Sequence, residues 1–167
     1  MARTATDILK EAILLERRGK AFYSSVAEKS DSKSAQKIFQ MMAEEEDEHI
    51  KFLSEQFKNY EKNKEFISIE GYEEPAEDEA ALKVLTEQMK KEISAASFEA
   101  AAITAAMDFE ARAVKLYSGR AKEAVDPKEK ALYEMLYKWE MGHEKMLHEL
   151  NEDLKADIWN DNNFWPF

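Results

Sequence analysis

The chain has 167 residues and a formal net charge of −11 at pH 7. This length suits one domain whose core is large enough to fold without disulfides or structural metals. The excess of negative charge argues against binding to nucleic acid or to an anionic membrane, and it favours the attraction of cations. The absence of cysteine excludes disulfides, thiolate chemistry and iron–sulfur or rubredoxin-type centres from this sequence.

The composition favours helices throughout. The chain has only 4 Gly and 3 Pro, and no segment shows the sustained alternation of β-branched residues that is typical of strands. We therefore expect an all-α fold with few, long elements. No apolar stretch approaches the roughly 20 residues of a membrane span, and the N-terminus lacks a signal-peptide pattern, so we expect a soluble, cytoplasmic protein.

Two helices are expected in the first part of the chain. The first covers about 6–29, and Glu16 lies on its apolar stripe and not on its polar face. The polar residues 30–34 predict a short turn that supplies N-caps for the second helix. That helix places Glu46 and His49 on its inner face, among apolar residues.

A crossover and a third helix follow. The helical periodicity fails over about 63–78, in an acidic segment that contains glycine and proline, and this predicts a long connection. The third helix is expected over about 79–123, with a break near 94–97. Its alanine-rich centre places Glu110 on the inner face and allows a neighbouring helix to approach closely.

The fourth helix has a clear start signal. Asp126 is the expected N-cap, Pro127 occupies the first helical position, and Glu129 is placed to close a capping box. The inner stripe of this helix carries Glu140 and His143. Two hairpins joined by a long crossover predict a four-helix bundle with one crossover connection.

The C-terminal residues differ from the bundle that precedes them. We expect a bundle domain over 1–157, followed by a tail over 158–167 that contains two tryptophans and two phenylalanines. So many aromatic side chains are not expected to be left loose in water. The tail is predicted to cap one end of the bundle or to form a dimer contact.

The expected inner residues form a duplication. Shifting residues 16–55 by 94 positions onto 110–149 gives 11 identities in 40 positions. These identities include the glutamates, the histidines and one pair of tyrosines, which are Glu16 with Glu110, Glu46 with Glu140, His49 with His143, and Tyr23 with Tyr117.

The duplicated residues predict a site for two metal ions. In each Glu-x-x-His motif the two side chains project from one side of the helix, about one turn apart. Four carboxylates on apolar stripes are costly unless their charge is offset. Two divalent cations balance the four negative charges, and two neutral imidazoles complete the ligand set. Oxygen-rich sites with one imidazole per metal suit iron or manganese better than tetrahedral zinc.

Two structural alternatives apply to these motifs. An isolated Glu-x-x-His in so acidic a chain is more often a solvated pair of neighbours on a helix surface. Two copies on apolar faces, each preceded by a glutamate 30 residues earlier, favour the metal site. The remaining alternative is a bundle in which the glutamates face water or pair with Arg17, Arg18 and Arg112.

Other residues near the motifs have more ordinary interpretations. Tyr23 and Tyr117 lie two turns after Glu16 and Glu110, where each phenol either hydrogen-bonds a ligand carboxylate or belongs to the bundle core. Trp139 is expected to be a packing residue. The neighbouring acidic residues are expected to form a solvated helix face, and the alternative is that they guide cations inward; they are Glu44, Glu45, Asp47 and Glu48. A surface position is expected for the remaining histidine, His148.

At these residues the chain resembles the ferritin-like di-iron carboxylate superfamily, and most closely its rubrerythrin-like group. The resemblance covers nearly the whole chain and includes Leu14-Leu15-Glu16, Tyr23, residues 43–49, Asp108-Phe109-Glu110 and residues 140–143. It implies a bundle that binds two irons and reacts them with peroxide or dioxygen. It also implies that Glu46 and Glu140 bridge the two irons, and that Glu16 and Glu110 are terminal carboxylates. His49 and His143 would then each hold one iron.

The chain departs from rubrerythrins in three respects. They carry a rubredoxin domain with four cysteines, so we expect electrons here from a separate donor such as a rubredoxin-type protein. They place a further carboxylate one turn after the third-helix ligand, where this chain has Ala113, and they have Glu at the position of His143. The symmetric ligand set is similar to that of bacterioferritin-type ferroxidases.

Three functions therefore compete. The first is reduction of hydrogen peroxide or dioxygen by a di-iron protein, which we expect to be a homodimer. The second is ferrous iron oxidation and handling, for which storage would require a shell of many subunits. The third is a metal-free interaction bundle.

Overall fold

The computed structural model describes residues 3–72, 78–94 and 97–160. Within these ranges the chain forms helices and no strands, which confirms the all-α prediction. The helices are α1 (Ala5–Lys29), α2 (Lys33–Asn63), α3 (Glu79–Glu92), α4 (Phe98–Glu123) and α5 (Pro127–Asn160).

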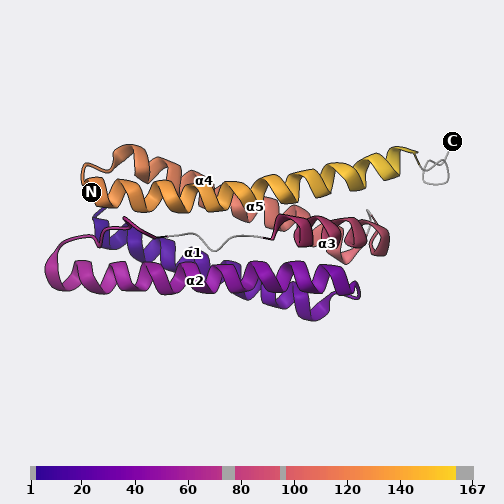
Figure 1. The fold of residues 1–167 in the computed structure, drawn as a ribbon, viewed down its shortest axis with the longest axis horizontal. Helices are drawn as coiled ribbons and strands as arrows, with labels where there is room; N and C mark the ends of the chain where they lie inside the picture. The colour runs from indigo at the N-terminus through magenta and orange to yellow at the C-terminus, as the bar shows by residue number, and fades with distance from the viewer. Residues whose placement is uncertain (1–2, 73–77, 95–96, 161–167) are drawn as a thin grey trace.

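The four long helices form two antiparallel hairpins that lie against each other. Figure 1 shows α1 with α2 on one side of the bundle and α4 with α5 on the other. The short helix α3 lies at the end of the bundle opposite the N-terminus, where it packs against α2 and α5. The predicted four-helix bundle of two hairpins and a crossover is confirmed.

The segment between the hairpins is longer than the sequence suggested. The expected third helix over 79–123 is divided into α3 and α4, so the crossover extends from 64 to 97 and contains α3. The helix α3 ends because Ile93 is extended, with φ −110° and ψ 157°. The helix α4 starts afresh at Ser97, whose hydroxyl accepts a hydrogen bond from the backbone N–H of Ala100 at 3.2 Å.

Side chains cap the helices of both hairpins. Ser32 caps α2 as predicted, since its hydroxyl accepts a hydrogen bond from the backbone N–H of Ala35 at 3.0 Å. Asp126 accepts one from the backbone N–H of Lys128 at 2.8 Å. Glu129, expected in a capping box, has an oxygen 2.7 Å from the Nε of Arg120, which the local pattern did not reveal. This ion pair ties the start of α5 to the end of α4.

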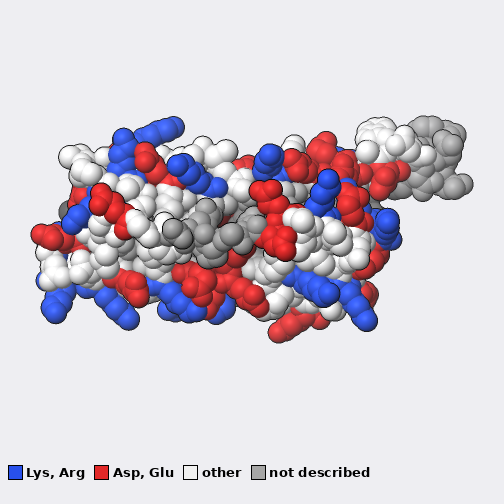
Figure 2. All heavy atoms as spheres, in the orientation of Figure 1, with Lys and Arg blue, Asp and Glu red and all other residues white. Residues whose placement is uncertain are grey.

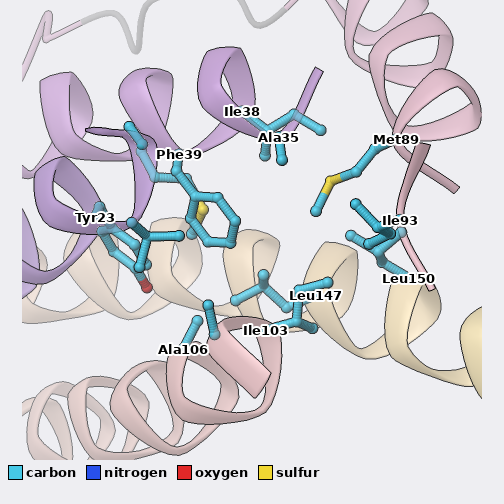
Figure 3. Close-up of a cluster of buried hydrophobic side chains, with 14 of the residues drawn as sticks. Tyr23, Ala35, Ile38, Phe39, Met89, Ile93, Ile103, Ala106, Leu147 and Leu150 are labelled. Carbon is cyan, nitrogen blue, oxygen red and sulfur yellow. The ribbon is translucent and has the colours of Figure 1, made fainter. Parts of the chain in front are cut away.

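Two apolar clusters fill the bundle. One lies towards α3 and contains Tyr23, Phe39, Met89, Ile103 and Leu147, all of which are labelled in Figure 3. The other lies towards the N-terminus and contains Leu9, Leu53, Tyr117, Leu132 and Trp139. Each cluster draws on both hairpins, so burial of apolar area holds the hairpins together. The duplicated tyrosines fall one in each cluster.

The surface of the bundle is acidic over α2, and its last helix extends beyond the predicted domain boundary. Acidic side chains gather over the middle of α2 on the face shown in Figure 2. No helix in the described part of the chain is long and apolar enough to cross a membrane. The helix α5 continues to Asn160, past the expected boundary between 157 and 158, and Trp159 is 68% exposed. Residues 161–167 of the expected tail lie outside the described residues, and its role as a cap or dimer contact stays a prediction.

Candidate metal centre

The six candidate ligands meet between the two apolar clusters, and all of them are buried. The largest exposed fraction among them is 6%, for His143, and Glu46, Glu110 and Glu140 are fully buried. All four helices of the bundle contribute, through Glu16 on α1, Glu46 and His49 on α2, Glu110 on α4, and Glu140 and His143 on α5. The alternative in which these glutamates face water is therefore contradicted.

One group of ligand atoms surrounds His49. Its Nδ1 lies 3.2 Å from Glu16 Oε2, 3.1 Å from Glu140 Oε1 and 3.6 Å from Glu46 Oε2. The four ligand atoms of this group all lie within 4.8 Å of one another. Three carboxylates from three helices thus converge on one imidazole nitrogen.

A second group surrounds His143. Its Nδ1 lies 3.6 Å from Glu110 Oε1 and 3.7 Å from Glu140 Oε2. With Glu46, these residues again place four ligand atoms within 4.8 Å of one another. Glu46 and Glu140 belong to both groups, which is the arrangement that two bridging carboxylates require.

The tyrosines connect the two halves of the duplication crosswise. The hydroxyl of Tyr23, on α1, donates to Glu110 of α4, and the hydroxyl of Tyr117, on α4, donates to Glu16 of α1. Both phenols are fully buried. Each carboxylate that belongs to only one group is therefore held by a phenol from the other half of the repeat.

The pKa values of the buried carboxyl groups and imidazoles in this cluster depart from their usual ranges. Burial raises the pKa of Glu46 well above its usual range, and burial raises the pKa of Glu110 to about 8. Burial opposes ionisation of Glu140 as well, but the adjacent imidazoles of His143 and His49 outweigh it and hold the pKa of Glu140 well below its usual range. Burial disfavours the imidazolium forms too, yet the facing carboxylates raise the pKa of both histidines.

The donor set fits two metal ions. Both oxygens of Glu46 and of Glu140, one oxygen of Glu110 and the Nδ1 of His143 are buried without a hydrogen-bond partner among the described residues. Buried polar atoms are rarely left unpaired, and these point into the two groups. Two divalent cations would give the atoms partners and would balance four carboxylates. Six ligands rich in oxygen, with one imidazole per group, suit iron or manganese better than a four-coordinate zinc.

The sequence patterns missed one contact at this centre. Glu45 was assigned to a solvated face, but its carboxylate contacts the Nε2 of His143. Trp139, expected to be a packing residue, does pack, and its partner is the ring of His49, at a centroid distance of 4.8 Å. His148 is exposed, as predicted. Glu45 lies directly before a ligand in the sequence, but no local pattern showed that its side chain reaches α5.

Comparison with known proteins agrees with this geometry. A family model described as Rubrerythrin matches residues 7–151. The chain belongs to the rubrerythrin family. The match includes all six residues of the centre, and the family and the buried cluster together fit a dinuclear site of the di-iron type. Neither the comparison with curated proteins nor the comparison with solved structures finds a match.

Proposed function

We propose that this member of the rubrerythrin family is a di-iron oxidoreductase that reduces hydrogen peroxide or dioxygen. The observation that supports the proposal most is the pair of overlapping ligand groups that share Glu46 and Glu140 inside the bundle. Two ferrous ions held there would supply two electrons and polarise the O–O bond of the oxidant. Manganese is the alternative metal for the same donor set.

The residues of the chain have separate tasks in this proposal. Glu46 and Glu140 bridge the two positions, while Glu16 and Glu110 each close one of them. The crosswise phenols fix the orientation of these two terminal carboxylates. Each hydroxyl keeps its proton, because burial and the adjacent carboxylates raise the pKa of Tyr23 and that of Tyr117 well above 10. The terminal ligands thus accept a hydrogen bond at any physiological pH.

The apolar clusters limit the access of water to the centre. Phe39 and Ile103 on one side, and Leu53 and Leu136 on the other, are less than 2% exposed. A dry surrounding strengthens the electrostatic interactions within the site and protects a reactive centre from side reactions.

The proposed enzyme needs an electron donor for its metal centre, and we expect it to form an oligomer. A separate electron donor such as a rubredoxin-type protein would return the centre to its reduced form. We expect a homodimer that works in the cytoplasm. A measured particle mass of two chains would support this, whereas a shell of 24 chains would favour iron storage.

A ferroxidase or iron-handling function is the second candidate, and one observation favours it. Ala113, one helical turn after Glu110, is buried at 1% exposure and offers no carboxylate to the centre. Each ligand group therefore has one histidine and one terminal glutamate. Such a symmetric shell is suited to binding and oxidising two ferrous ions without a change of ligand.

Rapid mixing of the di-ferrous protein with each oxidant tests the proposal. We expect the centre to be oxidised faster by hydrogen peroxide than by dioxygen at equal concentrations. A dioxygen rate equal to or above the peroxide rate would move the assignment to ferroxidase or oxidase. The Glu46→Ala/Glu140→Ala double variant should show neither reaction.

A further inference from the structure

The two histidines of the centre have different neighbours outside the ligand groups. The same 94-residue shift that pairs the ligands also pairs Glu45 with Trp139, each directly before a bridging glutamate. Both side chains reach across the bundle to the histidine of the other hairpin. A carboxylate and an indole therefore occupy equivalent positions in the repeat, but the carboxylate contacts a ring nitrogen and the indole stacks on a ring face.

Glu45 holds the outer nitrogen of His143. The Nδ1 of His143 faces the second ligand group, and its Nε2 contacts the carboxylate of Glu45. The Glu45 side chain is 33% exposed and the His143 side chain 8%, so the carboxylate spans from the surface of α2 to the buried ring. A carboxylate in this place fixes the tautomer and the ring orientation of a metal-binding histidine and raises its basicity.

Trp139 gives His49 a different environment. The two rings are stacked at a centroid distance of 4.8 Å and an interplanar angle of 8°. Tyr72 lies over the indole at 5.7 Å, and Trp139 is only 9% exposed. Among the described residues, the carboxylates within ion-pair distance of His49 are Glu16, Glu46 and Glu140, all from its own ligand group. His49 thus has an indole stacked on the face of its ring, and among the described residues no carboxylate is within ion-pair distance of its Nε2.

The other ligands do not offset this difference. Glu46 and Glu140 are common to both groups, and each terminal glutamate accepts a hydrogen bond from one buried phenol. Among the described residues, the contrast between Glu45 and Trp139 therefore makes the surroundings of the two histidines unequal.

We propose that Glu45 is a positioning residue that makes the two metal positions unequal, so that the position held by His143 binds its metal more tightly and fills first. The inference rests on the proposed metal centre. It concerns the order of metal binding and not the reaction with an oxidant.

Calorimetric titration of the metal-free protein with Mn²⁺ tests the inference. We expect two unequal steps in the parent protein. Glu45→Gln should weaken binding of the first metal by about 10-fold to 100-fold, and Glu45→Asp should recover part of the loss. Glu44→Gln is the matched control, because it removes the same charge from the adjacent exposed position without touching His143. Trp139→Phe should leave the first step unchanged.

A spectroscopic measurement shows whether the first metal occupies one position or divides between both. With one equivalent of ⁵⁷Fe²⁺ under anaerobic conditions, the parent should give predominantly one Mössbauer doublet, and Glu45→Gln should give two. Circular dichroism and the melting temperature of the metal-free Glu45→Gln protein should match those of Glu44→Gln, which separates positioning from folding.

The outcomes distinguish this inference from the proposed function. If Glu45→Gln weakens the first step no more than Glu44→Gln does, or if one equivalent of iron divides equally in the parent, the inference is overturned and the metal centre stands. If the parent binds no metal, both fail.

Discussion

Adding one methyl group at Gly19 should disturb both the packing and the metal centre. A Cβ at this position would lie 2.7 and 2.8 Å from two ring atoms of Phe109, and 3.4 Å from the carboxyl carbon of Glu46. The ring cannot move away easily, because it packs edge-on against Tyr23 and Arg112 lies over it at 5.6 Å. Gly19 therefore provides the space that Phe109 occupies beside Glu46.

The magnitude follows from two opposing effects. Replacing a helical glycine by alanine stabilises a helix by up to about 1 kcal/mol, while overpacking a well-filled core costs about 1–3 kcal/mol. Gly119→Ala is the matched control, since a Cβ there meets no atom within 4 Å and only the first effect applies. We expect the free energy of unfolding of Gly19→Ala to be roughly 1–3 kcal/mol below that of Gly119→Ala.

Urea denaturation of the two metal-free variants measures this difference directly. Metal titration should also show weaker binding in Gly19→Ala, because the added methyl group would lie 3.4 Å from the carboxyl carbon of Glu46 and would crowd it. Equal stabilisation of both variants, with unchanged metal affinity, would refute the close packing of Gly19 against Phe109.

Three further predictions concern the ligands and their charges. Tyr23→Phe and Tyr117→Phe should each weaken binding of one metal by at least about 10-fold, and titrations in which both match the parent would contradict the crosswise hydrogen bonds. Metal should raise the melting temperature at neutral pH, because it binds only the folded bundle; identical melting with and without metal would oppose this. From pH 6 to 8 the free energy of unfolding of the metal-free protein should fall by roughly 2 kcal/mol, at about 1.4 kcal/mol per pH unit for each proton that only the folded form holds. The free energy falls because burial raises the pKa of Glu110 from 4.5 to about 8, so the folded form keeps a proton that the unfolded chain has lost. The raised pKa values of the histidines act in the same direction, while the lowered pKa of Glu140 matters only below pH 4.5. Denaturation curves that do not depend on pH would contradict the prediction.

The helices and the set of inner residues could be predicted because both depend on local patterns. Helical periodicity depends only on which residues are apolar, and it places Glu16 or Glu110 on an inner face without knowledge of the partner helix. The duplication then links residues that are far apart in the sequence. The division into α3 and α4 was only partly foreseen, because it depends on Ser97 as a cap and on Met89 finding a buried place against the bundle.

Contacts across the bundle could not be predicted in the same way. Whether Tyr23 binds Glu110 or lies in the core depends on the rotation and spacing of two helices that are far apart in the sequence. Glu45 is one residue away from the ligand stripe, and the sequence gives no sign that α5 passes close enough for His143 to meet it. Interactions of this kind follow from helix packing and not from periodicity.

The positions of the bound metals show directly whether the six residues form one dinuclear centre. Crystals of iron-loaded or manganese-loaded protein should show two anomalous scattering peaks per chain. We predict that Glu46 and Glu140 contact both peaks, that the Nδ1 of His49 contacts one of them, and that the Nδ1 of His143 contacts the other. A single peak, or peaks that lie away from Glu46 and Glu140, would contradict a dinuclear site that shares these two glutamates.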